Sequence, residues 1–168
     1  MRTHSTIAIS GATLIAAMAV AMTGRPSAEE AGATFQGVWR TLEVTVPGPT
    51  ARTFKPEATL AIFHGRHYSR IEVHAEQPRP LLADQATASA DQLRAVWGPF
   101  VGEAGTFEVT SNQITMYATV AKNPAVMASG ASSVYTYRRD GDLLTLTQLR
   151  TPAGPTSAPV IVKLTRVE

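Results

Sequence analysis

Three histidines lie close together in the sequence and are the first residues whose chemistry could matter. His64, His67 and His74 are of the type and number that hold a catalytic zinc ion. His64 falls at a predicted turn, and the odd spacing of His67 and His74 places them on opposite faces of one strand, because successive side chains alternate. The sequence therefore predicts no metal site.

Arrangements for nucleophilic or acid–base catalysis are equally sparse. Ser69 lies two residues after the second of these histidines, but the sequence contains no G-x-S-x-G motif around it or elsewhere. Glu72 and Glu76 share one side of a predicted strand, and Glu103 and Glu108 flank the next. All four carboxylates are interpreted as parts of solvated strand faces. We therefore expect no catalytic residue and no cofactor.

Several aromatic and long side chains are candidates for the wall of a small-molecule site, because such sites are mostly apolar with a few placed polar groups. Adjacent residues of a strand point to opposite sides, so only one alternating set among the candidates can face inward. Ordinary core packing is the alternative role for each of them. The candidates are Met116, Tyr117, Tyr135, Tyr137 and Arg138.

The elements that would position these residues are almost all strands. One helix is predicted, from Thr87 to Val96, with Thr87 or Ser89 as its cap and Gly98-Pro99 at its end. Clusters of Pro and Gly predict loops at 47–56, 123–130 and 151–159. Eight segments with alternating apolar residues predict strands: Phe35–Val46, Glu57–His64, Arg66–Ala75, Phe100–Thr110, Asn112–Val120, Ser132–Arg139, Asp142–Leu149 and Pro159–Val167.

Tight turns between these segments predict hairpins. Asp140-Gly141 and Ser111-Asn112 are two-residue turn signals, and His64-Gly65 marks a third turn. The predicted pairs are Arg139 with Asp142, Tyr137 with Leu144 and Tyr135 with Leu146 in one hairpin, and Val109 with Ile114 and Phe107 with Met116 in the other. Short strands joined in this way predict an all-β antiparallel meander that closes into a barrel of about eight strands, since closure removes exposed edges.

The N-terminus is predicted to be an export signal rather than part of the fold. Arg2 precedes an apolar run of 16 residues, Ile7 to Met22, with no acidic residue before Glu29. That run is shorter than the roughly 20 residues of a membrane span, which is the alternative. We expect cleavage near Ala28, a signal at 1–28 and one barrel domain at 29–168. The protein would then be periplasmic or secreted, without stable membrane insertion.

Removal of the signal changes the charge balance. Two of the 15 Lys and Arg residues lie in it, which leaves 13 bases against 13 acids in residues 29–168. No basic stripe remains for nucleic acid. The chain contains no Cys, so its core must hold the fold without a disulfide.

The order of several short motifs resembles that of the bacterial lipocalin-like domain family, within the wider lipocalin-type group of barrels. The motifs are Phe35-Gln36-Gly37-Val38-Trp39-Arg40, Phe63-His64-Gly65-Arg66-His67-Tyr68-Ser69, Gly105-Thr106-Phe107-Glu108-Val109, Tyr137 to Leu146, and Leu164 to Glu168. The resemblance implies that Gly37, Trp39 and Arg166 close one end of the barrel, with Arg150 as a second candidate for the arginine. It implies a fold and no single activity.

The sequence thus favours an exported barrel that binds a small apolar or amphipathic molecule, without a metal or cofactor, over an enzyme. Two alternatives remain open. One is a cofactor-free isomerase, cyclase or hydratase acting in the same cavity, and the other is a filled barrel that serves as an interaction or inhibitor module. The identity of the ligand and the oligomeric state do not follow from the sequence.

Overall fold

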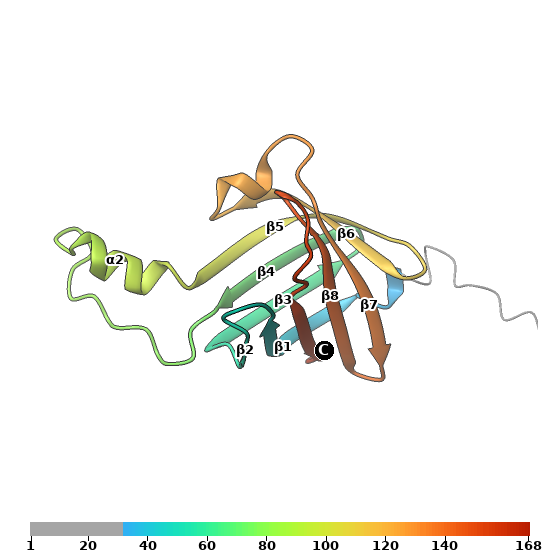
Figure 1. Cartoon of the computed structure of the whole chain (residues 1–168), viewed down its shortest axis with the longest axis horizontal. Coiled ribbons are helices and arrows are strands. Elements are labelled where there is room, and N and C mark those ends of the chain that lie inside the picture. The colour runs from blue at the N-terminus through green and yellow to red at the C-terminus, as the bar shows by residue number, and fades with distance from the viewer. Residues whose placement is uncertain (1–31) are drawn as a thin grey trace, which may run out of the picture.

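The computed structural model describes residues 32–168, and the predicted export signal lies outside them (Figure 1). All the main elements are antiparallel strands. The strands of the barrel are β1 (Gly37–Val46), β3 (Ala58–His64), β4 (His67–Val73), β5 (Phe100–Val109), β6 (Gln113–Ala121), β7 (Ser133–Asp140), β8 (Leu143–Thr151) and β10 (Ile161–Arg166). Within the described part, no helix has the length and apolar character needed to cross a membrane.

These eight strands form a closed barrel. Their order is β10-β1-β3-β4-β5-β6-β7-β8, and β10 also pairs with β8, which completes the ring. The prediction of an all-β antiparallel meander of about eight strands with one short helix is confirmed. Alternation and β-branched content located all the barrel strands, because the side chains of each strand point in turn to the interior and to the outside.

The predicted loops contain three further short elements. β2 (Arg52–Phe54) pairs with β1, β9 (Gly154–Pro155) pairs with β8, and the 3₁₀ turn η1 (Pro124–Met127) follows β6. The helix α2 spans Ala90–Trp97, and its cap is Ser89 rather than Thr87. The Ser89 side chain accepts from the backbone N–H of Gln92, whose side chain accepts in return from the N–H of Ser89.

The two predicted hairpins have different outcomes. The pairs Val109 with Ile114 and Phe107 with Met116 are confirmed. The register of the β7–β8 hairpin is wrong by two residues: Tyr137 pairs with Leu146, because the turn is Gly141-Asp142 rather than Asp140-Gly141. Gly141 has a φ of +57°, which favours glycine at the first turn position. A shift of two residues preserves the face of each side chain, so the predicted apolar face is still correct.

The two ends of the barrel differ in their connections. The end that carries Trp39, called here the Trp39 end, is bordered by the tight turns at 65–66, 111–112 and 141–142. At the other end, called here the mouth, four long connections join the strands, at 47–57, 74–99, 122–132 and 152–160. The connection that carries α2 projects from the barrel at the left of Figure 1.

The core lies inside the barrel toward the Trp39 end. Aromatic rings pack against one another there, with the Phe63 and Phe107 centroids 5.3 Å apart and those of Phe35 and Tyr137 4.8 Å apart. Edge-on and tilted contacts of this kind are favourable arrangements for aromatic rings. The buried cluster comprises Phe35, Trp39, Ala61, Phe63, Tyr68, Phe107, Ile114, Met116, Tyr135, Leu144, Leu146 and Leu164.

Candidate functional site

Trp39 is completely buried, and two guanidinium groups lie over it. Its indole Nε1 donates to the carbonyl of Phe35 at 2.7 Å. The Cζ atom of Arg166 is 4.7 Å from the ring centroid, and that of Arg139 is 5.8 Å away. Arg166 also pairs with Trp39 across β1 and β10, so the stacking follows from the register.

The glycine before this tryptophan is required by its backbone and by its neighbours. Gly37 has a φ of +114°, and a Cβ atom there would overlap the carbonyl oxygen of Glu168. Arg139 and Arg166 both donate to the carbonyl of Thr34, at 3.1 and 3.5 Å. The residues expected to close one end of the barrel are therefore brought together at that end. Arg150, the second candidate, pairs with Val134 and Pro155 on other strands.

The candidate wall residues divide between the two faces of the sheet. Met116 and Tyr135 point inward and are buried, and Tyr137 packs against the same core. Tyr117 and Arg138 are the chain neighbours of inward residues and lie on the outer surface. The inward set is therefore Met116, Tyr135 and Tyr137, and the other two candidates do not line the interior.

Charged residues lie inside the barrel between the aromatic core and the mouth. Arg70 on β4 and Glu103 on β5 are direct cross-strand partners, and Nη2 of Arg70 is 3.1 Å from Oε1 of Glu103. The Tyr68 hydroxyl donates to the same carboxylate at 3.3 Å. Burial raises the pKa of Tyr68, and the negative charge of Glu103 raises it further, so this hydroxyl stays protonated.

Glu72 extends this group of polar residues toward β1. Its side chain is only 3 % exposed, Oε1 accepts from the Thr41 hydroxyl at 2.9 Å, and Oε2 is 2.8 Å from Nε2 of His74. Burial acts to raise the pKa of Glu72, but hydrogen bonds from His74 and Thr41 and the charge of Arg70 outweigh it. The pKa of Glu72 is therefore lowered, and the group is an ionised carboxylate in the barrel wall.

These contacts correct the interpretation of two carboxylates as solvated. Glu72 and Glu103 face the interior, whereas Glu76 and Glu108 are exposed and pair with surface arginines. We call Tyr68, Arg70, Glu72 and Glu103 the interior polar cluster. Sequence alternation missed the cluster because the usual pattern is reversed in β4. Arg70 and Glu72 face the interior, whereas the apolar Ile71 faces out and is 49 % exposed. An Arg directly opposite a Glu in the β4–β5 register is the signal that identifies the cluster.

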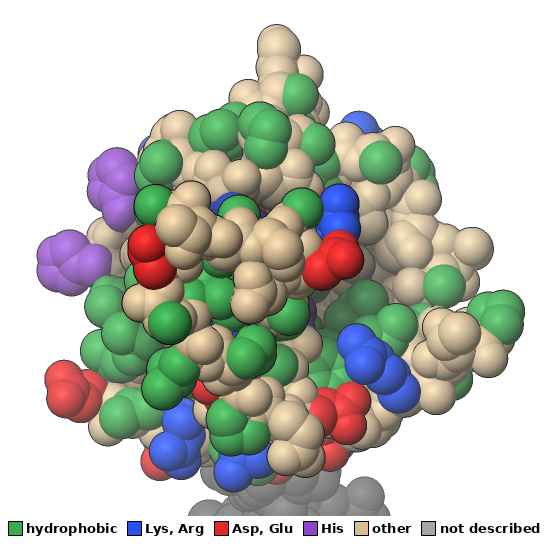
Figure 2. All heavy atoms as spheres, turned by 90° about the vertical axis from the view of Figure 1, so that its left-hand side faces the viewer, with side chains coloured by type: hydrophobic (Ala, Val, Ile, Leu, Met, Phe, Trp, Pro, Cys, Tyr) green, Lys and Arg blue, Asp and Glu red, His purple; other side chains and the backbone are tan. Residues whose placement is uncertain are grey.

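A cavity of about 540 Å³ opens at the mouth beside this cluster. Arg70 and Glu103 contribute to its wall, and apolar groups form most of the rest, from the start of β5, the end of β6 and η1. Lys122 holds this wall in place, because its ammonium donates to the carbonyls of Trp97, Gly98 and Phe100. Figure 2 views the α2 end of the molecule, where hydrophobic, acidic and basic side chains are mixed on the surface. The apolar wall residues are Phe100, Val101, Ala121, Pro124 and Val126.

Arg70 has hydrogen-bonding capacity left over beside this cavity. Its Nε is buried and has no hydrogen-bond partner among residues 32–168. Burial acts to lower the pKa of Arg70, but Glu72, Tyr135, Glu103 and Tyr68 together outweigh it and raise the pKa, so the guanidinium is permanently charged. About a fifth of the Arg70 side chain, 21 %, is exposed. A partly buried guanidinium with donors left over is the kind of group that fixes the orientation of a ligand.

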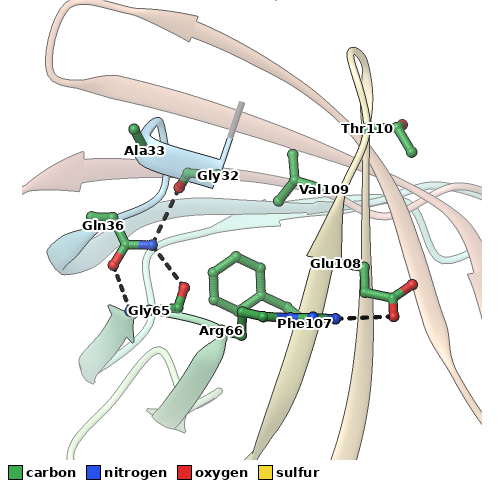
Figure 3. A pocket seen from close by; sticks show the side chains of 9 residues that line it. All are labelled: Gly32, Ala33, Gln36, Gly65, Arg66, Phe107, Glu108, Val109 and Thr110. Atoms are coloured by element: carbon green, nitrogen blue, oxygen red, sulfur yellow. Dashed lines mark hydrogen bonds and ion pairs between the residues drawn. The ribbon is translucent and has the colours of Figure 1, made fainter. Parts of the chain in front are cut away.

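A second cavity, of about 690 Å³, lies at the Trp39 end (Figure 3). Gln36 crosses one side of it, donating to the carbonyl of Gly65 at 3.0 Å and accepting from its N–H at 2.8 Å. The ion pair in its wall, Arg66 with Glu108, is largely solvated. This cavity therefore has no buried polar group comparable to Arg70, and Gly32, the first described residue, forms part of its wall.

The three histidines do not converge. His64 and His67 are partners across the β3–β4 hairpin and both are exposed, whereas His74 bonds Glu72 near the mouth. Among the described residues, no group of three or more His, Cys, Asp or Glu side chains is placed to hold a metal ion. Ser69 pairs with Ile62 and Ala104 on its neighbouring strands. Within residues 32–168, no His, Asp or Glu side chain forms a hydrogen bond with its hydroxyl.

Comparisons with known proteins add no relative. A scan against protein-family models gave no match, and a search of curated proteins gave none either. The closed eight-stranded antiparallel barrel is consistent with a calycin-like fold. The function is therefore inferred from the mouth cavity and its side chains.

Proposed function

We propose that this protein binds a small amphipathic molecule in the cavity at the mouth of its barrel. The observation that carries the proposal is the combination, in one cavity of about 540 Å³, of an apolar wall with the partly buried pair Arg70 and Glu103. Sites for small molecules have volumes of about 300–1,000 Å³ and the same composition, apolar groups with a few fixed polar ones.

The structure of the wall supports a preformed site. Both ends of the barrel have a cavity, but only the mouth cavity has the partly buried charged pair Arg70 and Glu103 in its wall, whereas the ion pair beside the cavity at the Trp39 end is largely solvated. Arg70 and Glu103 hold each other in position through the β4–β5 register. A site whose polar groups are already oriented loses less entropy when the ligand binds.

Acid–base catalysis in the same cavity has less support. The pair Glu72 and His74 has the residue types for it, but neither side chain contributes to the wall of the mouth cavity. Glu72 is also fixed by Thr41 and by the charge of Arg70, which stabilise the carboxylate and make it a weak base. The carboxylate of this pair acts on Arg70 through its charge.

The proposal includes export and membership of the lipocalin-like family. Both depend on sequence features: the apolar run of Ile7 to Met22, and the ordered motifs around Trp39 and Arg166. The stacking of Arg166 on Trp39 is the arrangement that the resemblance implied.

Export is tested by the mass of the protein recovered from the periplasmic or culture fraction. That mass should correspond to a chain that lacks about 28 residues, and a full-length mass there would contradict cleavage.

The binding site is tested with N-phenylnaphthylamine, an uncharged apolar fluorophore. The fluorescence of the probe should rise on mixing with the protein and saturate. Ala121→Trp places an indole in the cavity wall and should weaken binding by at least about tenfold. Val120→Trp adds the same group one residue away, where the side chain is 62 % exposed, and should leave binding unchanged. Equal effects of the two substitutions would refute the site.

A further inference from the structure

We infer that the mouth cavity selects a ligand whose polar head is uncharged and both donates and accepts hydrogen bonds, such as an alcohol or a carboxamide. The inference rests on the proposed function and specifies the chemistry of its ligand. It follows from the charges and the unfilled hydrogen bonds of the interior polar cluster.

The cluster contains groups that need opposite partners. Arg70 makes one carboxylate contact among the described residues, from Nη2 to Glu103, and its side chain is partly exposed, so its guanidinium has further N–H groups to donate to an acceptor. Glu103 is an acceptor beside it, bonded by Tyr68 and paired with Arg70 through a single oxygen, Oε1. A hydroxyl or amide can accept from Arg70 and donate to Glu103 at the same time.

A charged head has an unfavourable neighbour in either case. A carboxylate that approaches Arg70 comes close to Glu103, and Glu72 already acts on the same guanidinium. An ammonium that approaches Glu103 meets Arg70 at 3.1 Å from that carboxylate. The charge of Arg70 is already balanced by Glu103 and Glu72. A ligand carboxylate or ammonium therefore gains too little attraction here to offset its loss of hydration.

The apolar wall sets the other half of the ligand. Phe100, Val101, Ala121, Pro124 and Val126 surround the space beyond Arg70 and Glu103. Lys122, the third charged residue of the wall, already donates to the carbonyls of Trp97, Gly98 and Phe100. An alkyl chain attached to the uncharged head would bury its surface there, which tightens binding by about fourfold for each methylene removed from water. The ligand class is therefore a medium-chain alcohol or amide.

The test compares four compounds with one alkyl chain and different heads: octanol, octanamide, octanoate and octylamine. The affinity of each compound is measured by its displacement of N-phenylnaphthylamine from the unmodified protein at neutral pH, where octanoate is negative and octylamine positive. We expect octanol and octanamide to bind at least about tenfold more tightly than the two ions. Equal or tighter binding of either ion overturns the inference and leaves the proposed function standing. Failure of all four compounds and of the probe to bind overturns both.

A substitution that changes the charge of the cluster gives a second readout. Glu103→Gln removes one of the carboxylates beside Arg70 and should improve octanoate binding by about tenfold relative to octanol. Glu108→Gln is the matched control, since this residue lies on the same strand with its side chain 58 % exposed. An unchanged preference in Glu103→Gln overturns the assignment of the head group to this cluster.

Discussion

Replacing Trp39 with Ala is the sharpest test of how the Trp39 end is held together. The side chain is the largest of those that are fully buried, and it contacts Arg166 at 4.7 Å and the carbonyl of Phe35 at 2.7 Å. Truncation of a buried Trp costs about 3–5 kcal/mol. We expect a value toward the top of that range, because the substitution also leaves the Phe35 carbonyl without its donor and two guanidinium groups without their ring.

The loss is measured as the free energy of unfolding in urea, followed by far-ultraviolet circular dichroism. Trp97→Ala is the matched control, because the only other Trp of the chain is 41 % exposed and packs on Phe100. It should cost less than about 1 kcal/mol. If Trp39→Ala does not fold, Trp39→Phe keeps part of the ring and should show an intermediate loss. A Trp39→Ala protein within about 1 kcal/mol of the unmodified one would refute this account of the barrel end.

Three further substitutions test other parts of the structure by the same unfolding measurement. Gly37→Ala should destabilise the protein more than Gly48→Ala. Both glycines have a positive φ, but only at Gly37 would a Cβ atom overlap neighbouring atoms. Equal losses of stability would contradict the clash. Arg70→Met should cost about 3–5 kcal/mol by leaving the largely buried carboxylate of Glu103 without its cation, whereas Arg66→Met at the exposed pair should cost under about 1 kcal/mol. The lowered pKa of Glu72 stabilises the fold above the ordinary carboxyl pKa of 4.5, and this contribution is lost as the pH falls through the lower, folded-state pKa. Glu72→Gln should therefore be less stable than the unmodified protein at pH 7, by a margin that shrinks as the pH falls below 4.5 and through the folded-state pKa. A constant margin would argue against the ionised carboxylate.

The barrel could be predicted from the sequence because its strands alternate strongly. Each of the eight strands has one face on the core, and tight turns at residues such as Ser111-Asn112 set the order of pairing. The β7–β8 register does not follow from the sequence in the same way, since Asp140-Gly141 and Gly141-Asp142 are both suitable for a two-residue turn. The alternation itself does not distinguish two registers that differ by two residues.

The interior polar cluster could not be predicted in the same way. Tyr68, Arg70 and Glu72 follow the alternation of a solvated face, and only their pairing with β5 and the burial around them shows that this face is internal. The mouth is built from the long connections, where η1 has little periodic pattern. Sites that depend on such connections are set by tertiary contacts rather than by local sequence.

The binding of a ligand at the mouth is the central claim, and nuclear magnetic resonance of the protein titrated with octanol tests it most directly. The resonances of Val101, Ala121 and Val126, which line the mouth cavity, should shift and saturate, while those of Val109 in the cavity at the Trp39 end stay in place. Shifts confined to the Trp39 end, or no shift at any octanol concentration, would contradict the account.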